Sequence, residues 1–232
     1  MSEKLVNAAQ VAQKEVAALQ EKMDLAAKMY QAGREAEGAV LLQEAAVLTR
    51  NMSDRYRDLL MSSGNPDYAA RLEQIMAEVH PVQIGFTEQG WFGIRMEPLA
   101  LDRETASKEY IRSIIYPAMR NFFADKDTVR YDRCTVVYRH ILDADLPVTG
   151  RPDYTNAEIK MVTDTVAMYV MVDDNPVRCR LSHTCISGAN AHTEVYVIPQ
   201  EDFVEWVKLE DTIPDEGLPL TDQVPERWKV DM

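Results

Sequence analysis

The feature that most constrains the fold is a row of apolar residues close to the N-terminus. Its members are separated alternately by four and three residues: Leu5, Ala9, Ala12, Val16, Leu19, Met23, Ala26 and Tyr30. This spacing places them all on one side of a long α-helix. Gly33 and Gly38 interrupt the pattern, and a second helical run continues to about residue 60. The row predicts either a helical hairpin packed along it or a coiled-coil arm that dimerises.

The periodicity changes at Pro81, after a short helix expected from Pro66 to about His80. The segments that follow read as β-α-β-α-β-β, since runs rich in β-branched residues alternate with helical patterns. The strands are expected near 82–96, 134–142, 177–186 and 193–199, and the helices near 103–123 and from 156. We therefore predict an α+β fold in which two helices pack on a small mixed sheet, with the helical hairpin preceding it.

The predicted organisation has three parts. Residues 1–80 form the helical, coiled-coil-like region, residues 81–209 form the α+β domain, and residues 210–232 form an acidic, proline-containing tail. The net charge is −13, and residues 201–232 carry 10 acidic and 3 basic side chains. More than half of the excess negative charge therefore lies at the C-terminal end, and the rest of the chain is close to balanced.

The composition narrows the class of protein. No apolar run reaches the roughly 20 residues that a membrane-spanning helix needs, and the first ten residues lack a signal-peptide pattern. The cysteines are Cys134, Cys179 and Cys185, an odd number that does not suit a secreted disulfide framework. We expect a cytoplasmic protein without membrane contact.

Residues 151–175 hold most of the candidate functional groups, although each has a structural explanation. Thr155 and Glu158 have the spacing of a capping box at a helix start. Lys160 and Asp164 are four residues apart and would form an ion pair on one helix face. The run from Asp173 to Pro176 is typical of a turn.

The order of these groups nevertheless resembles the RusA-type Holliday-junction resolvases. That family's pattern is approximately P-D-x-D-N-L-x-K-x-x-x-D-A-L, followed by a D-D-x-Q-V turn. The residues of this chain that match it are Pro152, Asp153, Asn156, Lys160, Asp164, Asp173, Asp174 and Val177. The resemblance covers about residues 82–199, including a helix with a K-x-Y-I pattern at 108–111 and an expected terminal hairpin.

The resemblance implies a Mg²⁺-dependent endonuclease that acts on branched or structured DNA as a homodimer. It implies Asp153, Lys160 and Asp174 as catalytic residues. It implies Asp153, Asp173 and Asp174 as Mg²⁺ ligands, since hard carboxylate oxygens suit this ion. Thr155 stands where the family has a second aspartate, and Pro176 replaces its glutamine. These departures favour a degenerate site that binds DNA with weak or lost cleavage.

Two alternatives remain at this point. The chain could be a non-catalytic interaction or scaffold protein whose N-terminal helices bind a partner, and it also resembles uncharacterised proteins of mobile elements. A soft-metal site is the second alternative, because Cys179, His183 and Cys185 are separated by even numbers of residues, which puts them on one face of a strand. His192 would join that face if the preceding turn closes a hairpin.

Overall fold

The computed structural model describes residues 3–62, 66–100, 106–126, 129–145 and 154–228. The chain separates into two compact units, Met1–Leu72 and Glu73–Met232. Within the part of the chain that is described, no helix is long and apolar enough to cross a membrane.

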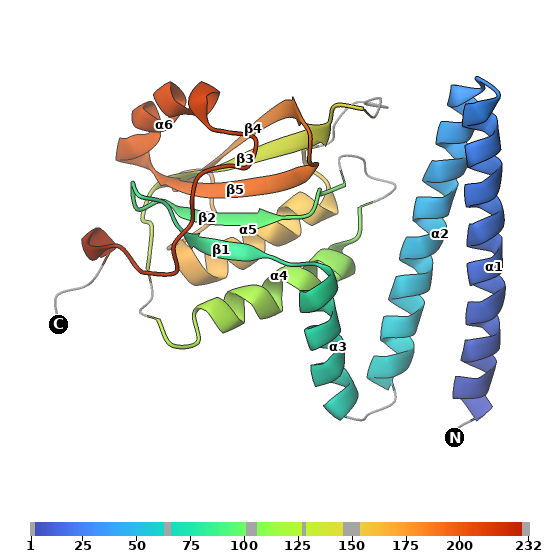
Figure 1. Ribbon diagram of the computed structural model, residues 1–232. Helices are drawn as coiled ribbons and strands as arrows, with labels where there is room; N and C mark the ends of the chain where they lie inside the picture. The colour runs from blue at the N-terminus through green and yellow to red at the C-terminus, as the bar shows by residue number, and fades with distance from the viewer. Residues whose placement is uncertain (1–2, 63–65, 101–105, 127–128, 146–153, 229–232) are drawn as a thin grey trace. The chain divides into compact units, whose positions relative to one another are not determined.

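The first unit is the predicted helical hairpin. Helices α1 (Glu3–Gln31) and α2 (Glu35–Ser62) lie side by side, as Figure 1 shows. Gly33 has a positive φ of 71° in the connection, a conformation that glycine adopts without steric cost. Ala26 and Ala45 are buried, and their small side chains allow the two helices to approach closely.

Only part of the predicted apolar row faces the helix partner. Ala26 is buried, whereas Val16, Met23 and Tyr30 are 55%, 48% and 40% exposed. Val16 and Met23 therefore face solvent, whereas the ring of Tyr30, although partly exposed, lies against Gly38 of α2. The spacing rule identified the helix correctly but did not tell which side of the row α2 covers.

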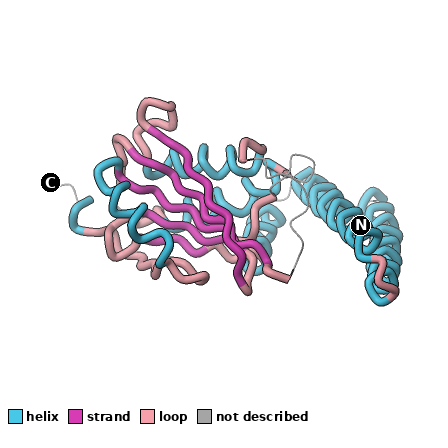
Figure 2. Tube along the Cα trace, turned by 90° about the horizontal axis from the view of Figure 1, so that it is seen from above, coloured by secondary structure: helices cyan, strands magenta, loops and turns pink. Residues whose placement is uncertain are grey.

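The second unit is built on a five-stranded mixed sheet, which confirms the predicted α+β class. Its strands are β1 (Gln83–Phe86), β2 (Phe92–Met96), β3 (Cys134–Asp143), β4 (Cys179–Gly188) and β5 (His192–Pro199), in the order β1-β2-β5-β3-β4. Only β3 and β4 run parallel, while the other neighbours are antiparallel. Figure 2 shows the twist of these strands, which L-residues impose on sheets.

Two apolar layers cover the sheet. On one face lie α4 (Lys108–Phe122) and α5 (Ala157–Val170). Their apolar side chains form the larger core cluster together with those of the strands. On the other face lies α6 (Phe203–Leu209), whose Trp206 packs in a smaller cluster with Trp91 and Tyr196. Helix α3 (Pro66–Val79) leads into this unit, and Arg120 of α4 pairs with its Glu73 at 2.8 Å.

Residues 210–228, the described part of the predicted acidic tail, pack against the sheet. Three short 3-10 turns, Gln200–Asp202, Glu210–Thr212 and Glu226–Trp228, punctuate the C-terminal segment. Thr221 exchanges backbone hydrogen bonds of 2.7 and 2.9 Å with Phe86. A Cβ at Gly93 would lie 2.6 Å from the end of the Leu220 side chain, so a larger residue there would force Leu220 to shift.

The expected terminal hairpin is wrong. Strands β4 and β5 are consecutive in the sequence, but β3 lies between them in the sheet. His192 contacts Glu194 Oε1 at 3.1 Å, on the face opposite Cys179, because alternate residues of a strand point to opposite faces. His192 therefore does not join Cys179, His183 and Cys185, and the alternative soft-metal set of four residues is not assembled.

Candidate functional site

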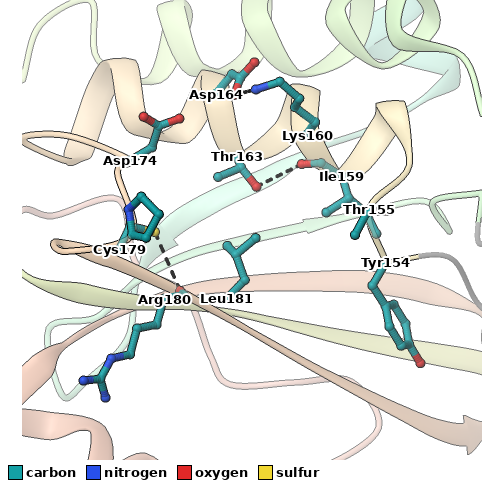
Figure 3. Close-up of a pocket in the computed structure, with 11 residues that line it drawn as sticks. Tyr154, Thr155, Ile159, Lys160, Thr163, Asp164, Asp174, Cys179, Arg180 and Leu181 are labelled. Carbon is teal, nitrogen blue, oxygen red and sulfur yellow. Dashed lines mark hydrogen bonds and ion pairs between the residues drawn. The ribbon is translucent and has the colours of Figure 1, made fainter.

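A hollow of about 690 Å³ lies between the start of α5, the turn after it and strand β4. We call it the Lys160 cleft. It is lined by Tyr154, Thr155, Ile159, Lys160, Thr163, Asp164, Asp174, Pro176, Cys179, Arg180 and Leu181 (Figure 3). The first turns of α5 and the segment from Asp174 to Leu181 thus contribute to one concave surface, which is the usual form of a binding site.

The start of α5 is fixed by Asn156 and not by the predicted capping box. Asn156 is the N-cap, and its side-chain oxygen accepts hydrogen bonds from the backbone N–H groups of Glu158 and Ile159 at 2.9 and 3.1 Å. Glu158 is 1% exposed, and its carboxylate accepts from the backbone N–H groups of Ala100 and Ser107 at 2.7 and 2.8 Å. Glu158 therefore holds two other segments against α5 and leaves capping to Asn156.

The charged side chains of the cleft are Lys160, Asp164 and Asp174. Lys160 Nζ lies 2.9 Å from Asp164 Oδ1, as the helical spacing predicted. The hydrogen bond to Asp164 raises the pKa of Lys160 most, and the charges of Asp164 and then Asp174 add to it. The ammonium therefore stays protonated, and the cleft carries one cation and two carboxylates.

Arg180 lines the cleft without adding its charge to this group. In Figure 3 its side chain points away from Asp164 and Asp174. This direction follows from strand alternation, because the neighbouring Cys179 belongs to the core cluster on the opposite face. Because the Lys160 cleft carries two carboxylates and one lysine, its surface favours cations or hydrogen-bonding ligands over a phosphate group without a counterion.

A stack of four rings borders the cleft at Tyr154. His183 lies parallel to Tyr154 and Tyr138, with centroid distances of 4.6 and 4.9 Å, and also to His140 at 5.7 Å. Burial, and to a smaller extent the neighbouring His183, lowers the pKa of His140 to about 4. Burial also lowers the pKa of His183. Both imidazoles are therefore neutral at pH 7, and the stack offers an uncharged aromatic wall.

Among the described residues, the predicted magnesium ligands do not form a common site. Asp174 lines the cleft, but Asp173 accepts a hydrogen bond from the backbone N–H of Asn175 at 3.1 Å and also from its side chain. Asp153 lies outside the described residues. Among the residues that are described, no three His, Cys, Asp or Glu side chains could hold a metal ion. The donor set that is visible does not fit Mg²⁺, so we derive no catalytic step from it.

Sequence reasoning missed Tyr154 and the pairing of Cys179 with Cys134. The two cysteines are direct partners in the β3–β4 ladder. Their type and the strand pattern were visible in the sequence, but the register of two parallel strands was not. Tyr154 carried no signal, because its position beside His183 depends on the turn that precedes α5.

Comparisons with known proteins place the chain in a family. A family model described as "Family of unknown function (DUF6100)" matches residues 1–221, so the chain belongs to that family. The match spans the helical hairpin and the sheet unit alike. No curated protein matched the chain.

Among solved structures, the chain is similar to the periplasmic domain of Helicobacter pylori MotB (residues 90–256). The identity is 10%, and the alignment covers 57% of this chain and 97% of that one. The TM-score is 0.29, too low for the likeness to bear on fold or function.

Proposed function

We propose that this DUF6100 protein acts in the cytoplasm by binding and not by catalysis, with its α1–α2 hairpin as the contact surface. The observation that carries this proposal is the apolar surface that the hairpin leaves uncovered. The occupant is a second copy of the chain, so that two hairpins associate as a four-helix bundle.

The uncovered side chains follow the helix period. Val16, Met23 and Tyr30 are seven residues apart, and each is at least 40% exposed. Val11 and Leu25 form a second exposed row on α1, fourteen residues apart. Residues seven apart lie nearly above one another on a helix, so Val16 and Met23 form an apolar stripe that ends at Tyr30, whose ring also contacts Gly38 of α2. Stripes of this kind pack into the core of helical bundles.

The charge of the hairpin favours a second copy over a polyanion. Residues 3–62 contain 8 Lys and Arg against 9 Asp and Glu, a net charge of −1, whereas the whole chain has −13. Two hairpins can therefore approach with little repulsion, while their net charge gives DNA no overall electrostatic attraction. Enclosing the half-exposed Val16, Met23 and Tyr30 contributes about 1 kcal/mol for each side chain.

Light scattering after size exclusion tests this proposal on the full chain. Met23→Glu places a charge in the stripe and should shift the protein from dimer to monomer. Gln13→Glu adds the same charge at an exposed polar position of the same helix and should leave the dimer intact. Equal masses for the two variants would show that the stripe is not the contact.

A second candidate is binding of branched or structured DNA at the Lys160 cleft, as the RusA-type resemblance implies. It is supported by the convergence of Lys160, Asp164 and Asp174, three residues of the matched motif, on one hollow. In this reading Mg²⁺-dependent cleavage is weak or lost. Mg²⁺ belongs to this candidate only as the cofactor that the resemblance implies, because the described side chains do not form a site for it.

Titration of a four-way junction at low salt, with and without Mg²⁺, tests the second candidate. Lys160→Gln should weaken binding and reduce its salt dependence, whereas Lys208→Gln, an exposed lysine on α6, should not. Cleavage should be assayed beside Asp174→Asn. If neither Lys160→Gln nor Mg²⁺ alters binding, the cleft is not a DNA site.

A further inference from the structure

Two cysteines lie opposite each other on strands β3 and β4, and one of them, Cys179, lines the Lys160 cleft. We propose that Cys134 and Cys179 are a redox-active dithiol that closes to an intramolecular disulfide when a small disulfide compound enters the cleft. The proposal is independent of the proposed function, because it concerns only the β3–β4 ladder and the hollow beside it.

The ladder supplies the geometry. Cys134 and Cys179 are Cα partners in the parallel pairing of β3 with β4, and both belong to the core cluster on the same face. Adjacent strands are separated by about 4.8 Å, and a disulfide requires Cα atoms about 4.4–6.8 Å apart. The bond can therefore form by rotation of the side chains, without separating the strands.

The two thiols differ in access. Cys179 is 7% exposed and lines the cleft, whereas Cys134 is 1% exposed and is not among the lining residues. Figure 3 shows Cys179 beside Arg180, whose backbone oxygen lies 3.6 Å from the sulfur. A reagent that enters the cleft reaches Cys179 first, and Cys134 then lies behind it as the second thiol.

The interaction between the two thiols assigns the same order. It lowers the pKa of Cys179, although burial opposes this effect, and it raises the pKa of Cys134. Cys179 therefore loses its proton more readily and is the better nucleophile, since the thiolate is the reactive form. Cys134 keeps its proton until the second step.

The reaction is ordinary thiol–disulfide exchange. The Cys179 thiolate attacks one sulfur of the small disulfide, forming a mixed disulfide and releasing one small thiolate. Cys134 then loses its proton and attacks Cys179 Sγ, which releases the second small thiolate. The two protons of the cysteines end on the two released thiols. Two protein thiols are oxidised, and one small disulfide is reduced.

Cys185 provides a control on the same strand. It is exposed, its ladder partner is His140, and its sulfur lies 3.1 Å from the Tyr154 hydroxyl. With no cysteine opposite, it can form a mixed disulfide but cannot resolve it within the chain. A Cys185→Ser background therefore isolates the proposed pair.

The test is treatment of the folded Cys185→Ser protein with glutathione disulfide, followed by thiol counting and mass spectrometry of the intact chain and its peptides. We expect loss of both free thiols, loss of two hydrogen masses, and a peptide joining residues 134 and 179. Adding Cys134→Ser should halt the reaction at a glutathione adduct on Cys179. Adding Cys179→Ser should leave Cys134 unmodified, because it is buried behind the cleft.

Circular dichroism before and after treatment shows whether the product is folded, so that oxidation of unfolded chains is not counted. Retention of both thiols in the folded protein would overturn the proposal. A stable adduct on Cys179 in the presence of Cys134 would overturn it as well, because the second thiol would then not resolve the first. Prompt modification of Cys134 in the Cys179→Ser variant would contradict the assigned order.

Discussion

The buried ion pair between Arg139 and Glu194 gives the sharpest prediction about stability. Both side chains are almost fully buried, at 2% and 0% exposure. Glu194 also accepts a hydrogen bond from Tyr196 Oη at 3.2 Å and lies 3.5 Å from Arg95 Nε. One carboxylate thus balances two guanidinium groups. Arg139 also donates a hydrogen bond to the backbone carbonyl of Ile213 in the C-terminal segment, at 3.3 Å.

Replacing Glu194 by Gln keeps its shape and removes its charge. Two unit charges about 4 Å apart interact by about 4 kcal/mol at an effective dielectric constant of 20. Removing one partner of a buried ion pair lowers the free energy of unfolding by about 3–5 kcal/mol, because the other charge is left buried without compensation. We therefore expect Glu194→Gln to lower the free energy of unfolding by about 3–5 kcal/mol.

Arg139→Met should cost less, about 2 kcal/mol, because Glu194 keeps Arg95 and Tyr196 as partners. Arg139 Nε is also buried without a hydrogen-bond partner among the described residues, so its removal relieves a desolvation cost. Urea unfolding followed by tryptophan fluorescence measures both variants. Asp164→Asn, which breaks the exposed Lys160 pair, is the control and should cost less than about 1 kcal/mol. A loss below 1 kcal/mol for Glu194→Gln would refute the reasoning.

Three further predictions concern the second unit. Because the pKa of His140 is lowered to about 4, unfolded chains bind a proton between pH 6.5 and 4 that folded chains do not. The free energy of unfolding should therefore fall by up to about 3 kcal/mol as the pH drops from 6.5 to 4. His140→Gln should make this pH dependence smaller in urea titrations. Asn156→Ala removes the α5 cap and should lower the unfolding free energy by about 1 kcal/mol, whereas an unchanged midpoint would argue against Asn156 as the cap. Gly93→Ala places a Cβ against Leu220 and should lower the free energy of unfolding by about 1–3 kcal/mol. Adding Leu220→Ala should restore part of that loss.

The elements of this fold were accessible from the sequence because each has a local cause. The spacing between Leu5 and Tyr30 indicates a helix whatever it packs on, and the β-branched run at 134–142 indicates a strand. The α+β class follows from the order of such elements. What each element contacts depends on other parts of the chain, which no local pattern encodes.

The errors illustrate this limit. The short link between β4 and β5 suggested a hairpin, but β3 intervenes, because pairing is decided by which apolar faces can be covered together. Glu158 matched a capping box in spacing, yet its carboxylate binds backbone groups of segments more than fifty residues away. Within the candidate site, the approach of Lys160 to Asp164 was predictable from helix geometry, whereas only the family resemblance placed Asp174 in the same site.

Self-association through the hairpin is the central claim, and cross-linking of a mixed sample tests it most directly. Chains labelled with ¹⁵N and unlabelled chains are mixed, equilibrated and treated with a short lysine-reactive cross-linker. Lys14 and Lys28 are exposed on α1. The account predicts cross-linked peptides that join labelled and unlabelled chains through these lysines, and their loss in Met23→Glu. Mixed-label peptides that map only to the sheet unit, or none at all, would contradict it.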